Sequence, residues 1–368
     1  RAAPAARPPA MIWVPALLIS GAIVLPIAYL LLRAFGAGAE VWELLLRART
    51  LAILVRSVAL AAAVTGASTA IAVALAYLTA RTDLPLRRLW AVLTLLPLVI
   101  PSYVGGFLVI VALGPRGMLQ QFLQGPLRVE RLPEIYGFPG AMLTLTLLSY
   151  PYVLLTVRAA LWRLDPSLEE AARSLGHSPV DTFRRVTLPL LRPAITAGAL
   201  LVALYTLSDF GGVSLLRYET FTWAIYLQYE AAFDRTAAAA LSLVLVALAL
   251  SIVFAEATSR GRSRYYRSTV GTARPPSVVR LGRWRWLALA FCASIVLFSL
   301  AIPMAILIYW VVRGMAAGEA LGQVWVVAWN SAYVSALAAA TAVIAALPVA
   351  YLSVRYPGRF SYLVERLS

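Results

Sequence analysis

Long apolar stretches with few polar interruptions dominate the pattern of this chain. A helix needs roughly 20 mainly apolar residues to cross a lipid bilayer. Eight stretches meet that requirement, at residues 11–33, 57–80, 89–113, 141–161, 194–216, 236–257, 286–312 and 331–354. The pattern therefore predicts an all-α protein, a polytopic bundle of membrane helices. Pro97 and Pro101, followed by Gly105 and Gly106, indicate that the third span is kinked or broken.

Composition supports this interpretation and narrows the chemistry. The 368 residues are 61% hydrophobic and 13% charged, whereas a soluble domain is about 45–50% apolar. All 32 basic residues are arginine, so the chain has neither a Walker A phosphate lysine nor a Schiff-base lysine. One histidine, His177, and one cysteine, Cys292, exclude HExxH zinc sites and internal disulfides. The chain is therefore predicted not to be an enzyme, and Cys292 is predicted to be a buried packing thiol.

The arginines also indicate an orientation. With the N-terminus in the cytoplasm, the inner segments carry 22 arginines and the outer segments carry 10, in agreement with the positive-inside rule. The net charge of +16 is therefore interpreted as a topology signal with contact to membrane lipid, not as a nucleic-acid site.

An internal repeat divides the chain. Ala-Tyr-Leu-Thr-Ala-Arg at 76–81 matches Ala-Tyr-Leu-Ser-Val-Arg at 350–355, an offset of 274 residues. This predicts a first six-span unit at 1–258, an arginine-rich cytoplasmic linker at 259–285 and the first two spans of a second copy at 286–368. A second copy with two spans out of six is expected to be a C-terminally truncated piece of a protein of roughly 540 residues.

The polar stretch between the fourth and fifth spans is predicted to form two short helices. Ser167 and Glu170 can form a capping box for the first helix, and Gly176 can end it in a left-handed conformation. Its apolar residues share one face at helical spacing: Leu168, Ala171, Ala172 and Leu175.

The second of these helices is predicted to begin with Ser178 as its cap and Pro179 at its first position, with Asp181 three residues after the cap. Pro189 is expected to help end it. A short helix pair of this kind suits insertion into a groove on a partner protein.

The same stretch resembles the EAA signature of bacterial ABC-importer permeases. The signature is E-A-A, three residues, G, nine residues, I-x-L-P, and this chain has Glu170-Ala171-Ala172, Gly176 and Val186-Thr187-Leu188-Pro189 at that spacing. The resemblance implies the fold of type I ABC importer transmembrane domains. It also implies that the loop is a coupling helix docking on a dimer of ATP-binding cassette subunits, through Glu170, Ala171, Ala172, Gly176, Leu188 and Pro189.

The resemblance carries further expectations about partners and substrate. Segment 161–266 is similar to the ferric-iron import permeases, which are fused proteins with two six-span halves. A periplasmic substrate-binding protein would deliver the substrate at the bacterial inner membrane, and the partner subunit would use the ATP, so no cofactor or metal site is expected in this chain. Thiamine and other small-solute permeases remain the main alternative. An ion-coupled secondary transporter and an intramembrane enzyme are the others.

Asp209 is the one carboxylate well inside a predicted span. Intramembrane acids are costly and often functional, so Asp209, Gly211 and Gly212 are candidates for the translocation path. The other interpretation is that the helix breaks at Gly211-Gly212 and leaves Asp209 as a cap. The outer segment that follows is rich in tyrosine and carboxylate oxygens, which suit a hard cation, although tyrosine is also common at membrane interfaces.

Overall fold

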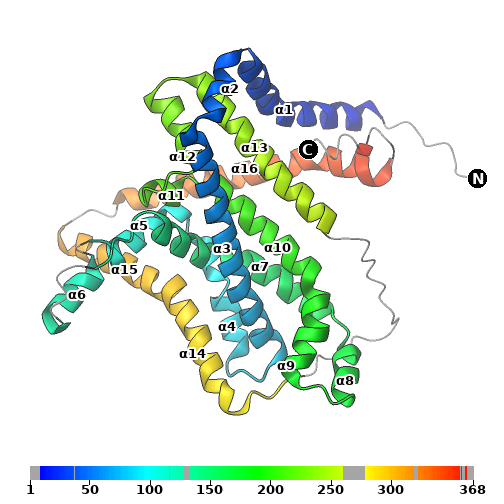
Figure 1. Ribbon diagram of the computed structural model, residues 1–368, viewed down its shortest axis with the longest axis vertical. Helices are drawn as coiled ribbons and strands as arrows, with labels where there is room; N and C mark the ends of the chain where they lie inside the picture. The colour runs from blue at the N-terminus through cyan, green and yellow to red at the C-terminus, as the bar shows by residue number, and fades with distance from the viewer. Residues whose placement is uncertain are drawn as a thin grey trace, which may run out of the picture. The chain divides into compact units, whose positions relative to one another are not determined.

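The computed structural model describes residues 9–36, 38–115, 117–127, 132–259, 278–318, 322–356, 358 and 361–362. Over these ranges the chain is helical (Figure 1), and the only β-type pairing there is an isolated bridge between Thr82 and Val279. Within the same ranges, eight helical runs are long and apolar enough to cross a membrane. The predicted all-α membrane bundle is confirmed.

The helices fall into long spans and short connecting pieces. The long ones are α1 (Ala10–Phe35), α3 (Ala48–Arg81), α7 (Phe138–Arg163), α10 (Leu188–Ser208), α13 (Arg235–Ser259) and α16 (Gly322–Arg355). The shorter ones are α2 (Ala39–Leu46), α4 (Arg87–Leu93), α5 (Ser102–Leu113), α6 (Met118–Leu127), α8 (Pro166–Ser174), α9 (Pro179–Thr182), α11 (Gly211–Leu215), α12 (Phe221–Tyr226), α14 (Arg285–Val296) and α15 (Ile302–Ala316). A π turn over Leu297–Ala301 joins α14 to α15.

The third and fifth predicted spans differ from the observed helices. The predicted span 89–113 is broken, as the prolines indicated, because α4 ends at Leu93 and α5 begins only at Ser102. The run able to cross a membrane there is Ser102–Gln124. The predicted span 194–216 was too long, because α10 ends at Ser208 and a separate short helix follows.

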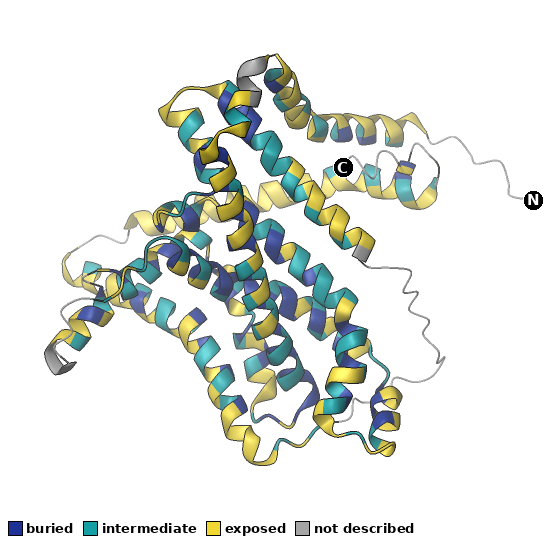
Figure 2. Ribbon diagram, in the orientation of Figure 1, coloured by how far each residue is buried: buried dark blue, intermediate teal, exposed yellow. Residues whose placement is uncertain are grey.

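The chain divides into two compact units, one of residues 42–309 and one of residues 1–41 with 310–368. In the larger unit α3, α7 and α10 pack against one another, and Figure 2 shows that buried residues concentrate on them. Their main apolar core includes Leu60, Val64, Leu75, Leu145, Tyr150, Val153, Leu154 and Val202. Small residues permit this packing, since a Cβ on Gly198 would lie 2.7 Å from the Val153 Cα.

The smaller unit contains α1 and α16, which pack through Ala16 and Leu352. Both α3 and α16 have 34 residues. Each bound of α16 lies 274 residues after the corresponding bound of α3, the offset of the sequence repeat. The helix bounds thus agree with the repeat, while the division at residues 258 and 285 stays a prediction.

Cys292 provides a test of the packing of the larger unit. Its thiol is fully buried in the main core, as the sequence predicted. We expect a polar maleimide to leave Cys292 unmodified in native membranes and to modify it after denaturation, as read by mass spectrometry. The matched control is Leu175→Cys, because Leu175 is 82% exposed at the C-terminal cap of α8. Equal labelling of both thiols in native membranes would show that α14 does not pack as described.

Candidate functional site

The polar loop after α7 begins with a cap that the sequence interpretation missed. The Ser167 N–H donates to the Asp165 carboxylate at 3.0 Å, so Asp165 is the N-cap and Pro166 is the first helical residue. The predicted capping box of Ser167 and Glu170 is therefore wrong. Asp165 takes the role because its short side chain can turn back onto the free N–H groups of the first turn.

The end of α8 follows the prediction. Gly176 has a φ of +87°, the left-handed conformation that favours glycine. The Gly176 N–H donates to the Arg173 carbonyl and the His177 N–H to the Ala172 carbonyl, which satisfies the last carbonyls of the helix. The sharp turn that follows separates α8 from α9.

The second helix begins as predicted but does not end where predicted. The Ser178 hydroxyl accepts from the Asp181 N–H at 3.2 Å, and Pro179 is the first residue of α9. The helix then passes through a π turn at Phe183–Thr187 directly into α10, and Pro189 lies in the first turn of α10. The wider π turn accommodates the ring and the missing N–H of Pro189, so the proline does not end the helix.

The predicted contact residues of the loop do not share one face. Glu170, Ala171 and Gly176 are exposed, Ala172 is buried, and Leu188 and Pro189 are half-buried. The predicted apolar face of α8 is thus divided: Ala172 packs inward, while Leu168, Ala171 and Leu175 point to the surface. We call Leu168, Glu170, Ala171 and Leu175 the exposed face of α8.

Glu169, not Glu170, is the buried acid of the loop. Its carboxylate accepts from the Thr187 hydroxyl at 2.9 Å and lies 3.8 Å from a guanidinium nitrogen of Arg81, the last residue of α3. Both side chains are almost completely buried. Sequence reasoning missed this pair, because the two residues are 88 positions apart. Arg81 stood out only as the last residue of the repeated sequence at 76–81, which gives no hint of a partner.

A second group of residues surrounds the break after α10. The Asp209 carboxylate accepts from the Gly212 N–H at 2.9 Å and from the Val213 N–H at 3.2 Å. The Asp209 carbonyl also accepts from the Thr222 hydroxyl at 2.6 Å. Asp209 is the C-cap residue of α10, and its side chain also caps the first turn of α11, whose N-cap residue is Phe210, so the break starts at Asp209 itself.

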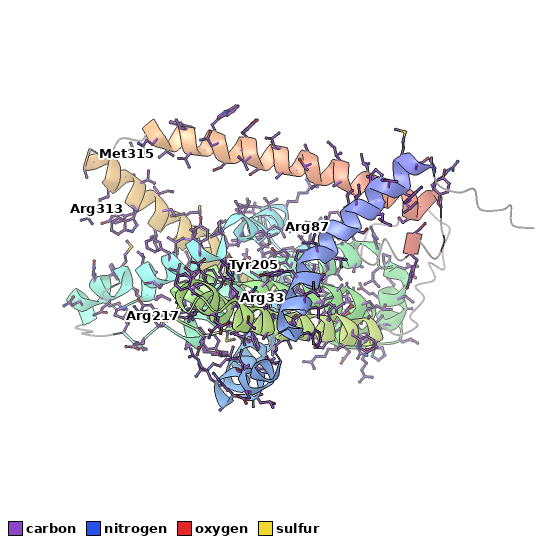
Figure 3. The ribbon with its side chains drawn as sticks, turned by 90° about the horizontal axis from the view of Figure 1, so that it is seen from above. Arg33, Arg87, Tyr205, Arg217, Arg313 and Met315 are labelled. Atoms are coloured by element: carbon purple, nitrogen blue, oxygen red, sulfur yellow. The ribbon has the colours of Figure 1, made fainter. Side chains whose placement is uncertain are left out.

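The glycines beside Asp209 allow α5 and α11 to approach closely. A Cβ on Gly211 would lie 2.8 Å from the Tyr103 Cβ, and one on Gly106 would lie 3.4 Å from the Gly212 Cα. Tyr205, one turn before Asp209, lies within the bundle (Figure 3) with its ring 5.5 Å from that of Tyr152. The structure thus brings Asp209, Gly211 and Gly212 together at one helix break.

A cavity of about 520 Å³ with both polar and apolar lining residues opens near the other end of α3 from Arg81. Arg56, Arg217, Tyr218 and Glu219 are among its lining residues, and Figure 3 shows Arg217 toward the edge of the unit. Glu219 accepts from Arg49 at 2.7 Å and from Arg56 at 3.0 Å. Arg217 lines the same cavity without pairing to Glu219, so the arginines here outnumber this carboxylate and the rim carries positive charge.

Two of the residues whose oxygen atoms were predicted to suit a hard cation, Tyr218 and Asp234, have other partners. The Tyr218 hydroxyl donates to the Arg56 carbonyl, and Asp234 accepts from the Thr236 and Ala237 N–H groups at the start of α13. Partial burial raises the pKa of Tyr218, with Arg56 acting in the opposite direction. Tyr218 therefore stays protonated at neutral pH and acts as a donor.

Comparison with known proteins identifies the type of protein to which this geometry belongs. Residues 72–262, which include α7, the whole polar loop, α10 and α13, match the family described as the inner membrane component of binding-protein-dependent transport systems. The chain belongs to this family. The chain is thus a permease component, and its membrane helices and loop are those of an importer of this class.

Relatives and solved structures agree with this assignment. The permease is 36% identical over 365 residues to an Fe(3+)-transport system permease protein of Haemophilus influenzae, covering 98% of this chain and 68% of that protein. It is 36% identical over 177 residues to a probable molybdenum ABC transporter permease of Haloferax volcanii, covering 45% of this chain and 63% of the relative. A bacterial alginate ABC transporter in complex with its periplasmic protein has the same fold, with a TM-score of 0.55 at 17% identity over 69% of this chain and 95% of that one.

The role of Asp209 in the permease can be tested by paired substitutions. Asp209→Ala removes the acceptor for two N–H groups and should lower the free energy of unfolding by roughly 0.5–2 kcal/mol, as for other helix caps. Asp209→Asn keeps an acceptor oxygen and should be close to wild type. Chemical unfolding of the detergent-solubilised permease would measure both. An equal loss in the two variants would mean that the charge of Asp209, rather than its capping, stabilises the break.

Proposed function

We propose that this permease is the membrane subunit of an ABC importer for ferric iron, with ATP hydrolysis carried out entirely on a separate subunit. The observation that carries the proposal is the identity to the Fe(3+)-transport permease, which extends over 98% of the chain. Thiamine and the oxyanion-type substrates suggested by molybdenum and sulfate permease relatives are the alternatives. The lack of lysine supports the assignment of ATP hydrolysis to a partner.

The exposed face of α8 supports a docking role toward the ATP-binding cassette subunits. A nine-residue helix that exposes Leu168, followed by an exposed Leu175 at its C-terminal cap, is suited to insert into a hydrophobic groove. Within this loop Glu170, Ala171 and Gly176 would touch the partner. Ala172, Leu188 and Pro189, which are less exposed, would hold the loop against the spans.

The proposed orientation places the N-terminus and α8 in the cytoplasm. Arg81 and α8 lie at one end of α3. Arg56, which pairs with Glu219, lies near the other end, 25 residues before Arg81. At 1.5 Å per residue this separation is roughly 37 Å, enough to cross the hydrocarbon core. The arginine-rich rim around Glu219 would then face the periplasm, where a substrate-binding protein docks.

Transport would follow from alternating access. Docking of the binding protein delivers the substrate to the outer side, and ATP binding closes the ATPase dimer and moves α8. The movement of α8 opens the spans outward, and hydrolysis resets them. Asp209, Gly211 and Gly212 are proposed to border the path, because at this point the helix is interrupted and its backbone approaches α5 closely.

The docking proposal predicts two loss-of-association variants. Glu170→Arg places a long cation on the exposed face of α8, and Gly176→Pro cannot adopt the positive φ at the end of the helix. Both should abolish co-purification of the ATPase subunit while the permease still inserts into the membrane. The matched control is Arg88→Glu, a charge reversal at an exposed position on α4. Unchanged co-purification in both variants would contradict this role of the loop.

The substrate proposal predicts iron-dependent uptake. In a strain lacking its own ferric permease, expression of the complete transporter should restore uptake of ⁵⁵Fe at limiting iron, and excess molybdate, sulfate or thiamine should not compete. Uptake of one of those solutes without iron uptake would replace ferric iron as the substrate. The same strain with an ATPase subunit unable to hydrolyse ATP provides the control, and undiminished uptake there would favour an ion-coupled transporter.

A further inference from the structure

Arg81 joins more segments than its place at the end of a helix would require. Its guanidinium donates to the Leu161 carbonyl at 2.9 Å and to the Leu164 carbonyl at 3.4 Å, at the last turn of α7. The same guanidinium faces the Glu169 carboxylate of α8 at 3.8 Å. Only 1% of its side chain is exposed. One side chain of α3 therefore contacts both α7 and α8.

The backbone of Arg81 connects a further segment. The Arg81 carbonyl accepts from the Val279 N–H at 2.8 Å, and the Val279 carbonyl accepts from the Asp83 N–H at 3.2 Å. The Asp83 carboxylate also accepts from the Leu281 N–H at 2.8 Å. Residues 278–281 lead through a 3-10 turn at Gly282–Trp284 into α14, so these bonds connect the start of the second repeat to the end of α3 in the first.

Glu169 is held from its other side by the start of α10. Its second carboxylate oxygen accepts from Thr187, the last residue of the π turn that precedes α10. The rings of Tyr77 on α3 and Phe183 in that turn lie edge to face at 4.7 Å. The inward side of α8 is thus connected through Glu169 to α3 and α10 at once.

Stability alone does not explain a buried ion pair of this kind. Removing two charges from water is costly, and replacing a buried pair by apolar residues is often neutral or stabilising. Within the part of the chain that the structure describes, the Nε and Nη1 atoms of Arg81 have no hydrogen-bond partner, so the burial is only partly compensated. The pair also connects α8 to α3, and such a connection would matter if the two helices move together.

We propose that Arg81 is a positioning residue that passes the movement of α8 to the membrane spans. This inference rests on the proposed docking of the ATPase subunit on the exposed face of α8. When the ATPase moves that face, the Glu169 carboxylate on the opposite face pulls on Arg81. Because Arg81 is bound to the end of α7 and belongs to α3, these two central spans move with α8.

Reconstituted full-length transporter, with its ATPase and binding protein, would test this role. Arg81→Met removes the charge and keeps an unbranched stem, and Glu169→Gln keeps an acceptor for Thr187. Both variants should retain ATPase co-purification and basal ATP hydrolysis. Transport, and the stimulation of hydrolysis by the binding protein, should fall about tenfold or more, within the usual range of coupling between sites. The control Arg88→Met removes an exposed arginine near the same corner and should behave as wild type.

The double variant Arg81→Met/Glu169→Leu separates positioning from folding. With both charges removed, the corner can pack as an apolar contact, so we expect wild-type insertion and ATPase association with transport as low as in the single variants. Wild-type transport in the double variant would overturn the proposal, since the pair would then be dispensable. Loss of insertion or of ATPase association would overturn it too, by assigning the pair to folding or docking. Failure of the wild-type permease itself to bind the ATPase would instead refute the proposed function.

Discussion

Backbone N–H and C=O groups inside a membrane cannot form hydrogen bonds with water, and the structure of this permease depends on that constraint. Long helices satisfy most of these groups internally. Where a helix is interrupted or ends, a side chain completes the bonding: Asp209 accepts from N–H groups in the first turn of α11, and Arg81 donates to carbonyls at the end of α7. The free backbone groups at these points therefore have hydrogen-bond partners, and functional residues can lie there without leaving backbone groups unpaired in lipid.

Close backbone contact is the second condition for these interruptions. Between α5 and α11 the glycines Gly106, Gly211 and Gly212 leave space that side chains would otherwise fill. In the centre of the bundle Gly198 does the same between α10 and α7. Since helices in lipid gain little from apolar burial, such contacts and a few polar bonds must specify how they pack.

Local chemistry was the most predictable part of the molecule. The apolar stretches located the spans, and Gly176, Ser178 and Pro179 have the roles that their types suggest, because turn and cap preferences depend on neighbours in sequence. Interactions between distant segments could not be predicted in the same way. The pairing of Glu169 with Arg81 depends on how α3, α7 and α8 meet, and Pro189 was misjudged because the π turn before it has no clear sequence signature.

The bonds of Arg81 also bear on how the chain is made. Ribosomes produce α3 before α7 and α8, so Arg81 is synthesised 80 residues before Leu161 and 83 residues before Leu164. The last turn of α7 can therefore find its cap as soon as it is synthesised, and Glu169 follows within a few residues. Val279, whose N–H donates to the Arg81 carbonyl, is synthesised nearly 200 residues after Arg81. These bonds can therefore form in the order of synthesis, and the segment before α14 is the last of the bonded segments to be made.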